Sequence, residues 1–176
     1  LIIVRPTVIF GEGNRGNVFN LLYQIASGKF IMIGKGENKK SMAYIGNIVA
    51  FIETCILTEQ KYGLYNYVDS PDLTMNELVS QVRSQLKGKV GVGLRLPYWL
   101  GIILGFTADA ISFLTRKSLP ISVIRIKKFT SPSEFLSAKT TLDNFKAPFQ
   151  LSEGIQRTLI SEFVKPNPEQ EIFFSE

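Results

Sequence analysis

Short runs of apolar residues alternate with apolar residues at helical spacing along most of this chain. Runs rich in β-branched and aromatic residues predict buried strands over residues 1–4, 7–10, 30–33, 42–45 and 63–68, and residues 90–96 are a further candidate. Helical spacing predicts a helix over residues 18–27 and another that follows residue 45 and carries Cys55. Because strands and helices alternate, the pattern favours an α/β fold with parallel strand pairs.

Local signals set the ends of several predicted helices. Thr74 and Glu77 have the spacing of a capping box, in which each side chain accepts a hydrogen bond from the backbone of the other residue. Gly88 is placed to end the helix that follows, and Gly28 to end the first helix. Ser152 is predicted to cap a last helix that reaches residue 163. The chain is therefore more helical after residues 68–71.

The most apolar stretch, residues 96–108, opens a long predicted helix that breaks near residues 116–120, before a shorter helix over residues 121–129. This stretch is too short to span a bilayer before Asp109 interrupts it, so no transmembrane segment is expected. We expect a buried helix or the wall of a pocket, with peripheral attachment to a membrane surface as the alternative.

Composition narrows the chemistry that the chain can perform. With 45% apolar and 20% charged residues it can bury a core, which excludes a mostly disordered chain. The sequence has no histidine, so zinc chemistry and Ser-His-acid catalysis are excluded, and no metal site is expected. Cys55 has no local basic neighbour and is predicted to be a buried filler, in keeping with a reducing, cytoplasmic location. The net charge of +5 comes from dispersed residues, so no nucleic-acid partner is expected.

Several segments carry the candidate chemistry. Arg5-Pro-Thr-Val-Ile-Phe-Gly-Glu-Gly joins a buried strand to a proline-stiffened turn whose glycines allow close approach to a ligand. The later segments are Gly16-Asn-Val-Phe, Phe30-Ile-Met-Ile-Gly-Lys-Gly, Lys40-Ser-Met-Ala-Tyr-Ile-Gly-Asn-Ile-Val, Leu64-Tyr-Asn-Tyr, Ser137-Ala-Lys and Ser152-Glu-Gly-Ile-Gln-Arg-Thr. In this collinear order they resemble the C-terminal, substrate-binding part of the extended short-chain dehydrogenase/reductase family, in its NAD-dependent epimerase/dehydratase branch.

The resemblance implies a fold and a division of the chain. The fold would be α/β, the C-terminal portion of a Rossmann-type extended short-chain dehydrogenase/reductase, with parallel edge strands plus a small, mostly helical substrate domain. Residues 1–70 would be the last part of the dinucleotide-binding-type sheet with substrate-binding insertions, residues 71–165 the helical substrate-binding subdomain, and residues 166–176 a loose tail. Because the chain opens inside a predicted strand, we expect a fragment whose exposed sheet edge favours self-association.

The resemblance also implies roles for individual residues. The turn at Arg5, Pro6, Thr7 and Val8 would lie near the nicotinamide of NAD or NADP. A nucleotide-diphosphate sugar would be bound by a second set of residues, namely Asn17, Val18, Phe30, Met32, Lys40 and Arg125.

Three of these assignments have simpler alternatives or weaker support. Lys40 stands where the family usually has an arginine that grips the diphosphate, and an exposed turn lysine is the alternative. Asn17 could equally be a helix cap. Arg125 is assigned by its place in the sequence alone. Ser41 and Asn47 replace two aspartates of the family pattern, and Phe10 replaces a tyrosine.

Two signatures of the family are absent from these residues. No Gly-x-x-Gly-x-x-Gly turn lies between a strand and a helix, and no tyrosine is followed by a lysine four positions later, the pair that the family uses as its base. We therefore expect no catalytic residue in this chain, no tight binding of cofactor and no activity of the chain alone. By resemblance, the full-length parent would be an NAD(P)-dependent sugar-nucleotide epimerase/dehydratase, an isomerase that uses oxidoreductase chemistry and holds NAD or NADP, and this chain would be its substrate-binding fragment.

Two other functions remain open at this point. The first is an enzyme of the same superfamily that acts on a steroid or lipid-linked substrate, which the apolar residues 96–108 and the weak diphosphate residues favour. The second is a non-catalytic module that uses the fold to sense a ligand.

Overall fold

Two parallel strand pairs build the N-terminal half of the fold. The computed structural model describes residues 1–117, 119, 121–135, 142 and 145–174. Strand β1 (Ile2–Pro6) pairs with β6 (Gly63–Tyr67), and β2 (Val8–Phe10) pairs with β5 (Met42–Tyr44). The predicted α/β fold with parallel strands is confirmed, since helices lie between the paired strands in sequence.

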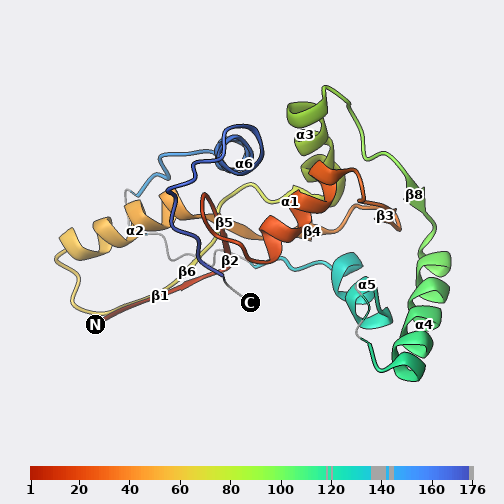
Figure 1. The fold of residues 1–176 in the computed structure, drawn as a ribbon. Helices are drawn as coiled ribbons and strands as arrows, with labels where there is room; N and C mark the ends of the chain where they lie inside the picture. The colour runs from red at the N-terminus through yellow and green to blue at the C-terminus, as the bar shows by residue number, and fades with distance from the viewer. Residues whose placement is uncertain (118, 120, 136–141, 143–144, 175–176) are drawn as a thin grey trace.

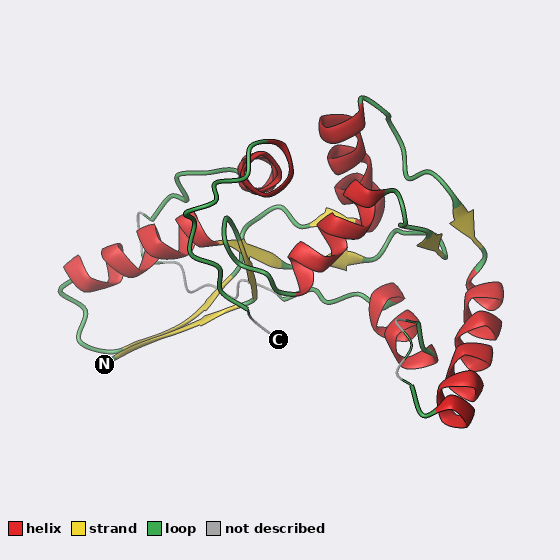
Figure 2. Cartoon of the chain, viewed as in Figure 1, coloured by secondary structure: helices red, strands yellow, loops and turns green. Residues whose placement is uncertain are grey.

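Of the other four strands, β3 and β8 are shorter than predicted, and β4 and β7 were not predicted. Strand β3 (Met32–Ile33) pairs in parallel with β8 (Arg95–Leu96), and β4 (Lys39–Lys40) pairs antiparallel with β7 (Leu73–Thr74). Figure 2 shows the strands as four separate short pairs. The predicted strand over residues 90–96 is wrong for most of its length, because Gly91 and Gly93 have positive φ angles of 86° and 80° that a strand does not allow.

Four helices cover these strand pairs: α1 (Asn17–Ser27), α2 (Ile45–Leu57), α3 (Met75–Lys87) and α6 (Leu151–Leu159), which continues as a π-helical turn (Ile160–Val164). The capping box is confirmed, because Thr74 Oγ1 accepts from Glu77 N at 3.2 Å and Glu77 Oε2 accepts from Thr74 N at 2.8 Å. Gly28 and Gly88 end their helices in the left-handed conformation, as predicted. The prediction that Ser152 caps the last helix is wrong, because Gln150 holds the cap position and α6 begins at Leu151.

The apolar core has two parts. The larger joins α1, α3 and α6 over β2, β3 and β5, and includes the fully buried Leu22, Met32 and Ile155. The smaller packs Phe51 and Cys55 of α2 against Tyr65 and Tyr67 of β6. The prediction that Cys55 is a buried filler is confirmed, and burial raises the pKa of its thiol.

Two further helices, α4 (Tyr98–Thr115) and α5 (Val123–Thr130), pack against each other and are called the arm below. The arm lies on the side of the molecule opposite the N-terminus and the β1–β6 pair (Figure 1). The expectation of a buried helix or pocket wall over residues 96–108 is wrong, because only 11% of α4 is buried. The long helix ends at Thr115, next to the predicted break, and by length and composition it is long and apolar enough to cross a membrane, which corrects the expectation of no such segment.

The C-terminal segment is held against the loop between β2 and α1. Arg15 N donates to Phe173 O at 2.7 Å, and Phe173 N donates to Gly13 O at 2.8 Å. Glu162 Oε1 accepts from Gly13 N at 2.7 Å, while Oε2 lies 3.1 Å from Arg15 Nη2. The expectation of a loose tail is therefore wrong for residues 170–173, because backbone hydrogen bonds fix them.

Candidate functional site

The turn between β1 and β2 lies at the carboxyl ends of paired parallel strands, where α/β folds commonly bind ligands. Arg5 and Pro6 are exposed there, and Val8 enters β2 opposite Met42. Thr7 N donates to Tyr67 O at 3.0 Å, which fixes the turn to β6. The hydroxyl of Thr7 is buried without a hydrogen-bond partner in the described structure. An orphaned buried hydroxyl at this position fits a polar ligand group.

A buried hydrogen-bond network adjoins this turn through Tyr67, whose backbone oxygen accepts from Thr7 N. Asp69 Oδ1 accepts from Asn47 Nδ2 at 3.0 Å and from Tyr67 OH at 2.9 Å, and its Oδ2 accepts from Tyr44 N at 2.7 Å. Burial raises the pKa of the Asp69 carboxyl, although these three hydrogen bonds act in the opposite direction. Burial, followed by the charge of Asp69, raises the pKa of Tyr67. The network ties the ends of β5 and β6 to the start of α2.

The network also explains one departure from the family pattern. Asn47 stands where the resemblance leads one to expect an aspartate, and its amide donates to Asp69. The same side chain donates to Phe149 O at 2.9 Å and accepts from Phe149 N at 3.0 Å. A carboxylate at position 47 would repel Asp69 in this buried setting, so the amide is the compatible side chain here.

Sequence reasoning missed one glycine pattern. Gly11, Gly13 and Gly16 have Gly-x-Gly-x-x-Gly spacing between β2 and α1, the context of a dinucleotide-binding turn. Gly13, at φ 79°, could carry no side chain, since a Cβ would lie 2.6 Å from Glu171 O. Its amide already donates to the carboxylate of Glu162. The loop therefore binds the protein's own C-terminal segment instead of presenting a free phosphate cradle.

Four predicted substrate-binding residues lie near α1 and β3. Asn17 is the first residue of α1 and is exposed, but it is not the helix cap, because Gly16 holds that position. Val18, Phe30 and Met32 are buried in the larger core. Phe30 packs edge-on against Phe129 of α5, with ring centroids 5.9 Å apart. These three side chains contribute packing in this structure.

Lys40 joins β4 to the end of α5. Its ammonium donates to Lys128 O at 2.9 Å, to Ser131 O at 2.6 Å and to Ser133 Oγ at 3.3 Å. An ammonium has three donors, so all three are engaged, and the charge lies at the negative end of the α5 dipole. Burial lowers the pKa of Lys40. The alternative of a simple exposed turn lysine does not describe these contacts, and binding of a diphosphate by Lys40 stays a prediction.

Arg125, the last predicted substrate-binding residue, is exposed on the first turn of α5, where Ser122 Oγ accepts from its backbone N at 3.2 Å. The structure thus brings Lys40 and Arg125 to the two ends of one helix. Among the residues that the structure describes, no three acidic or cysteine side chains converge on a metal position. Of the closing segments, Ser137-Ala-Lys lies outside the described residues.

No protein-family model matches the chain. An Escherichia coli O157:H7 protein, N-acetyl-alpha-D-glucosaminyl-diphospho-ditrans,octacis-undecaprenol 4-epimerase, is 49% identical over 100% of this chain and 53% of its own length. UDP-glucose 4-epimerase of Vibrio cholerae is 26% identical over 90% of this chain and 45% of its own length. The chain belongs to the NAD-dependent epimerase/dehydratase family. It matches the C-terminal part of these family members and spans about half the length of the curated relatives.

Solved structures of this family share the fold. A human epimerase family protein, solved with NADPH, superposes with a TM-score of 0.62 at 16% identity, over 89% of this chain and 47% of its own. Such structural neighbours carry NAD or NADP in their own complexes. The predicted fold class, the C-terminal portion of a Rossmann-type extended short-chain dehydrogenase/reductase, is confirmed.

Proposed function

We propose that this chain is the substrate-binding part of an NAD(P)-dependent 4-epimerase that acts on a sugar joined through a diphosphate to a polyprenol lipid. The observation that carries the proposal is the 49% identity, over the whole chain, to a relative whose name describes such a substrate. The relative named for UDP-glucose is only 26% identical. The lipid-linked substrate, which the apolar residues 96–108 also favour, therefore becomes the first candidate in place of the nucleotide sugar.

Residues at the nucleotide end of the site support this choice. Family resemblance places the strand at Phe30 and Met32 beside the nucleotide base, but both side chains are closed into the core here. A lipid-linked sugar diphosphate has no base to bind, so its enzyme needs no open base pocket. A nucleotide sugar stays the second candidate because of the Vibrio cholerae relative.

The cofactor side of the proposal rests on the turn between β1 and β2. A bound NAD or NADP would supply reversible hydride transfer at the sugar carbon. This chain would contribute Arg5, Pro6, Thr7 and Val8 beside the nicotinamide, where the orphaned Thr7 hydroxyl can donate one hydrogen bond. The Asp69 network would keep this turn rigid, which is what orientation of a sugar against a cofactor requires. We place the enzyme in the cytoplasm, as the single buried Cys55 suggests.

The test compares two substrates on the intact enzyme in detergent. One is N-acetylglucosaminyl diphosphate attached to a polyprenol, and the other is UDP-N-acetylglucosamine; the 4-epimers are separated by chromatography. We expect kcat/KM to favour the lipid-linked sugar by at least about tenfold, or about 1.4 kcal/mol. A preference for the UDP-sugar would overturn the substrate assignment. Turnover of neither substrate, with binding retained, would favour the ligand-sensing alternative.

A further inference from the structure

Helix α4 has its two glycines turned inward and most of its large apolar residues turned outward. Gly101 and Gly105 are buried: a Cβ on Gly101 would lie 2.6 Å from Ile33 Cγ2, and one on Gly105 would lie 3.0 Å from Val123 N. The exposed side chains are Tyr98, Trp99, Ile103, Leu104, Phe106, Ile111, Phe113 and Leu114. A helix at the surface of a protein in water has the reverse arrangement, so the outward face of α4 needs an apolar neighbour.

The arm is built to lie on a surface and not to cross a bilayer. With 18 residues, about 27 Å, α4 nearly matches the hydrocarbon thickness of about 30 Å, so its neighbours and not its length decide against crossing. Two thirds of the way along it, Asp109 Oδ2 accepts from Val123 N at 3.1 Å at the start of α5. Helix α5 also carries Arg125, Lys127 and Lys128, so one flank of α4 is covered by a basic helix. A helix that is apolar on one side and polar on the other lies in the plane of the membrane interface.

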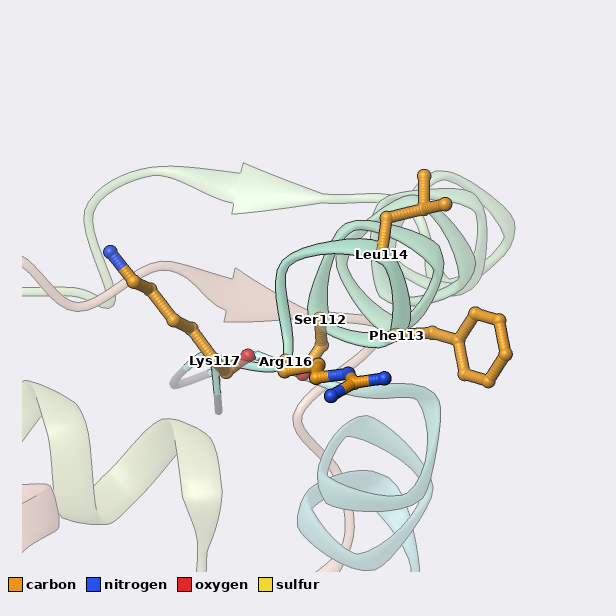
Figure 3. Close-up of a pocket in the computed structure, with 5 residues that line it drawn as sticks. All are labelled: Ser112, Phe113, Leu114, Arg116 and Lys117. Atoms are coloured by element: carbon orange, nitrogen blue, oxygen red, sulfur yellow. Dashed lines mark hydrogen bonds between the residues drawn. The ribbon is translucent and has the colours of Figure 1, made fainter.

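The charge of the arm is complementary to an anionic lipid surface. Residues 98–130 contain five basic residues and one acidic residue, Asp109, which faces α5. At the end of α4, Phe113 and Leu114 project away from the helix, while Arg116 and Lys117 extend to either side of it (Figure 3). These four residues line an open hollow together with Ser112, whose hydroxyl donates to Lys117 O at 2.6 Å. Basic side chains beside inserted apolar ones are the usual composition of interfacial helices.

We infer that the arm docks on an anionic membrane surface, with the outward face of α4 inserted at the lipid headgroups and the basic residues of the arm against them. The inference deepens the proposed function, because a polyprenol chain stays in the bilayer and an enzyme acting on its sugar diphosphate must work at that surface. Membrane affinity can nevertheless be measured without any substrate, so the two proposals fail separately.

The fluorescence of Trp99 reports directly on whether the outward face of α4 enters the membrane. It is the single tryptophan of these residues and lies 62% exposed on the outward face of α4. The full-length protein is titrated with vesicles of phosphatidylglycerol and phosphatidylethanolamine, and with vesicles of phosphatidylcholine alone. Subtracting the signal of a Trp99→Phe variant isolates this residue. We expect a blue shift of Trp99 emission and cosedimentation with the anionic vesicles, and at least about tenfold weaker binding to the neutral ones.

Matched variants distinguish vesicle binding by the arm from non-specific adsorption of other exposed apolar residues. Phe106→Ser with Phe113→Ser should weaken vesicle binding by at least about thirtyfold. Ile56→Ser with Leu57→Ser, which are also exposed but lie at the end of α2, should leave binding unchanged. Arg116→Gln with Lys117→Gln changes two exposed side chains only and should weaken binding to anionic vesicles by about fivefold per residue.

Three outcomes would overturn the inference. One is a Trp99 emission that does not respond to anionic vesicles. Another is a loss of self-association in the Phe106→Ser, Phe113→Ser variant, seen by light scattering, without loss of vesicle binding, which would assign the face to a second copy. The third is a loss of thermal stability in that variant with vesicle binding intact, which would assign the face to another part of the same protein. Epimerisation in detergent would remain in all three cases if the proposed function is right.

Discussion

The ammonium of Lys40 donates to the carbonyl oxygen of Ser131 at 2.6 Å, just beyond the last turn of α5. This contact fixes the arm to β4, which belongs to the body of the molecule. It also gives Lys40, which the family resemblance assigns to the diphosphate, a structural environment of its own.

Replacing Lys40 by methionine should loosen the arm. The variant removes three hydrogen bonds at the end of α5 and should cost about 1–2 kcal/mol of unfolding free energy. Lys39→Met is the matched control, because Lys39 is exposed beside it, and should change stability little. Urea unfolding measures both variants. If Lys40→Met keeps full stability but lowers substrate affinity in the intact enzyme, the diphosphate assignment is right and the structural one is wrong.

Gly105 should tolerate no side chain. A Cβ there would lie 3.0 Å from the N and Cα of Val123, and backbone atoms cannot move aside as a flexible side chain can. Gly105→Leu should therefore push α4 and α5 apart and cost about 1–3 kcal/mol. Ala110→Leu places the same side chain on the exposed side of the same helix, without the clash. Equal melting temperatures for the two variants would contradict this packing.

Asp69 should make stability depend on pH. Its folded pKa is raised above the ordinary value of 3.8, so its contribution to stability is fully present below that value and is lost as pH rises through the folded pKa. The urea midpoint of the natural protein should therefore fall relative to Asp69→Asn as pH rises above about 4. Asp69→Asn should be less stable at acidic pH, because its amide cannot accept from all three donors. A gap between the two proteins that widens with pH would contradict the raised pKa.

Residues 1–176 alone should bind no NAD at micromolar concentration and turn over no sugar substrate. In the intact enzyme, Thr7→Val should lower NAD affinity by about fivefold, the effect of one hydrogen bond. The unliganded stability should not fall, since the hydroxyl has no partner to lose. Calorimetry measures both. Tight NAD binding by residues 1–176 would contradict the first expectation, and unchanged NAD affinity of Thr7→Val would remove Thr7 from the cofactor site.

Elements whose signals are local could be predicted from the sequence. The helix behind Thr74 and Glu77 and the glycines that end α1 and α3 behave as predicted, because caps depend on a few neighbouring residues. The collinear motifs were enough to predict the family and its fold class. Parallel pairing, as in β1 with β6, also followed from the alternation of strands and helices, although which strands pair did not.

Features that depend on distant residues could not be predicted. The exposed face of α4 cannot be distinguished from a core face in the sequence, because apolar content alone does not say which neighbour a helix has. The contacts of Lys40 with residues 128–133 are visible only once α5 is placed beside β4. The glycine spacing at residues 11–16 could have been found in the sequence, but its occupation by Glu162 could not.

The hydrogen bond between Gly13 and Glu162 joins positions 149 residues apart. Closing so long a stretch of chain loses more conformational entropy than forming a helix or pairing neighbouring segments. This entropy is lost before the contact contributes any stability. We therefore expect the contact between Gly13 and Glu162 to form late in folding, after α1 and α3 have packed, and to be the first to open in local fluctuations of the folded protein. Hydrogen exchange should show the amides of Gly13 and Arg15 exchanging sooner than those of α3.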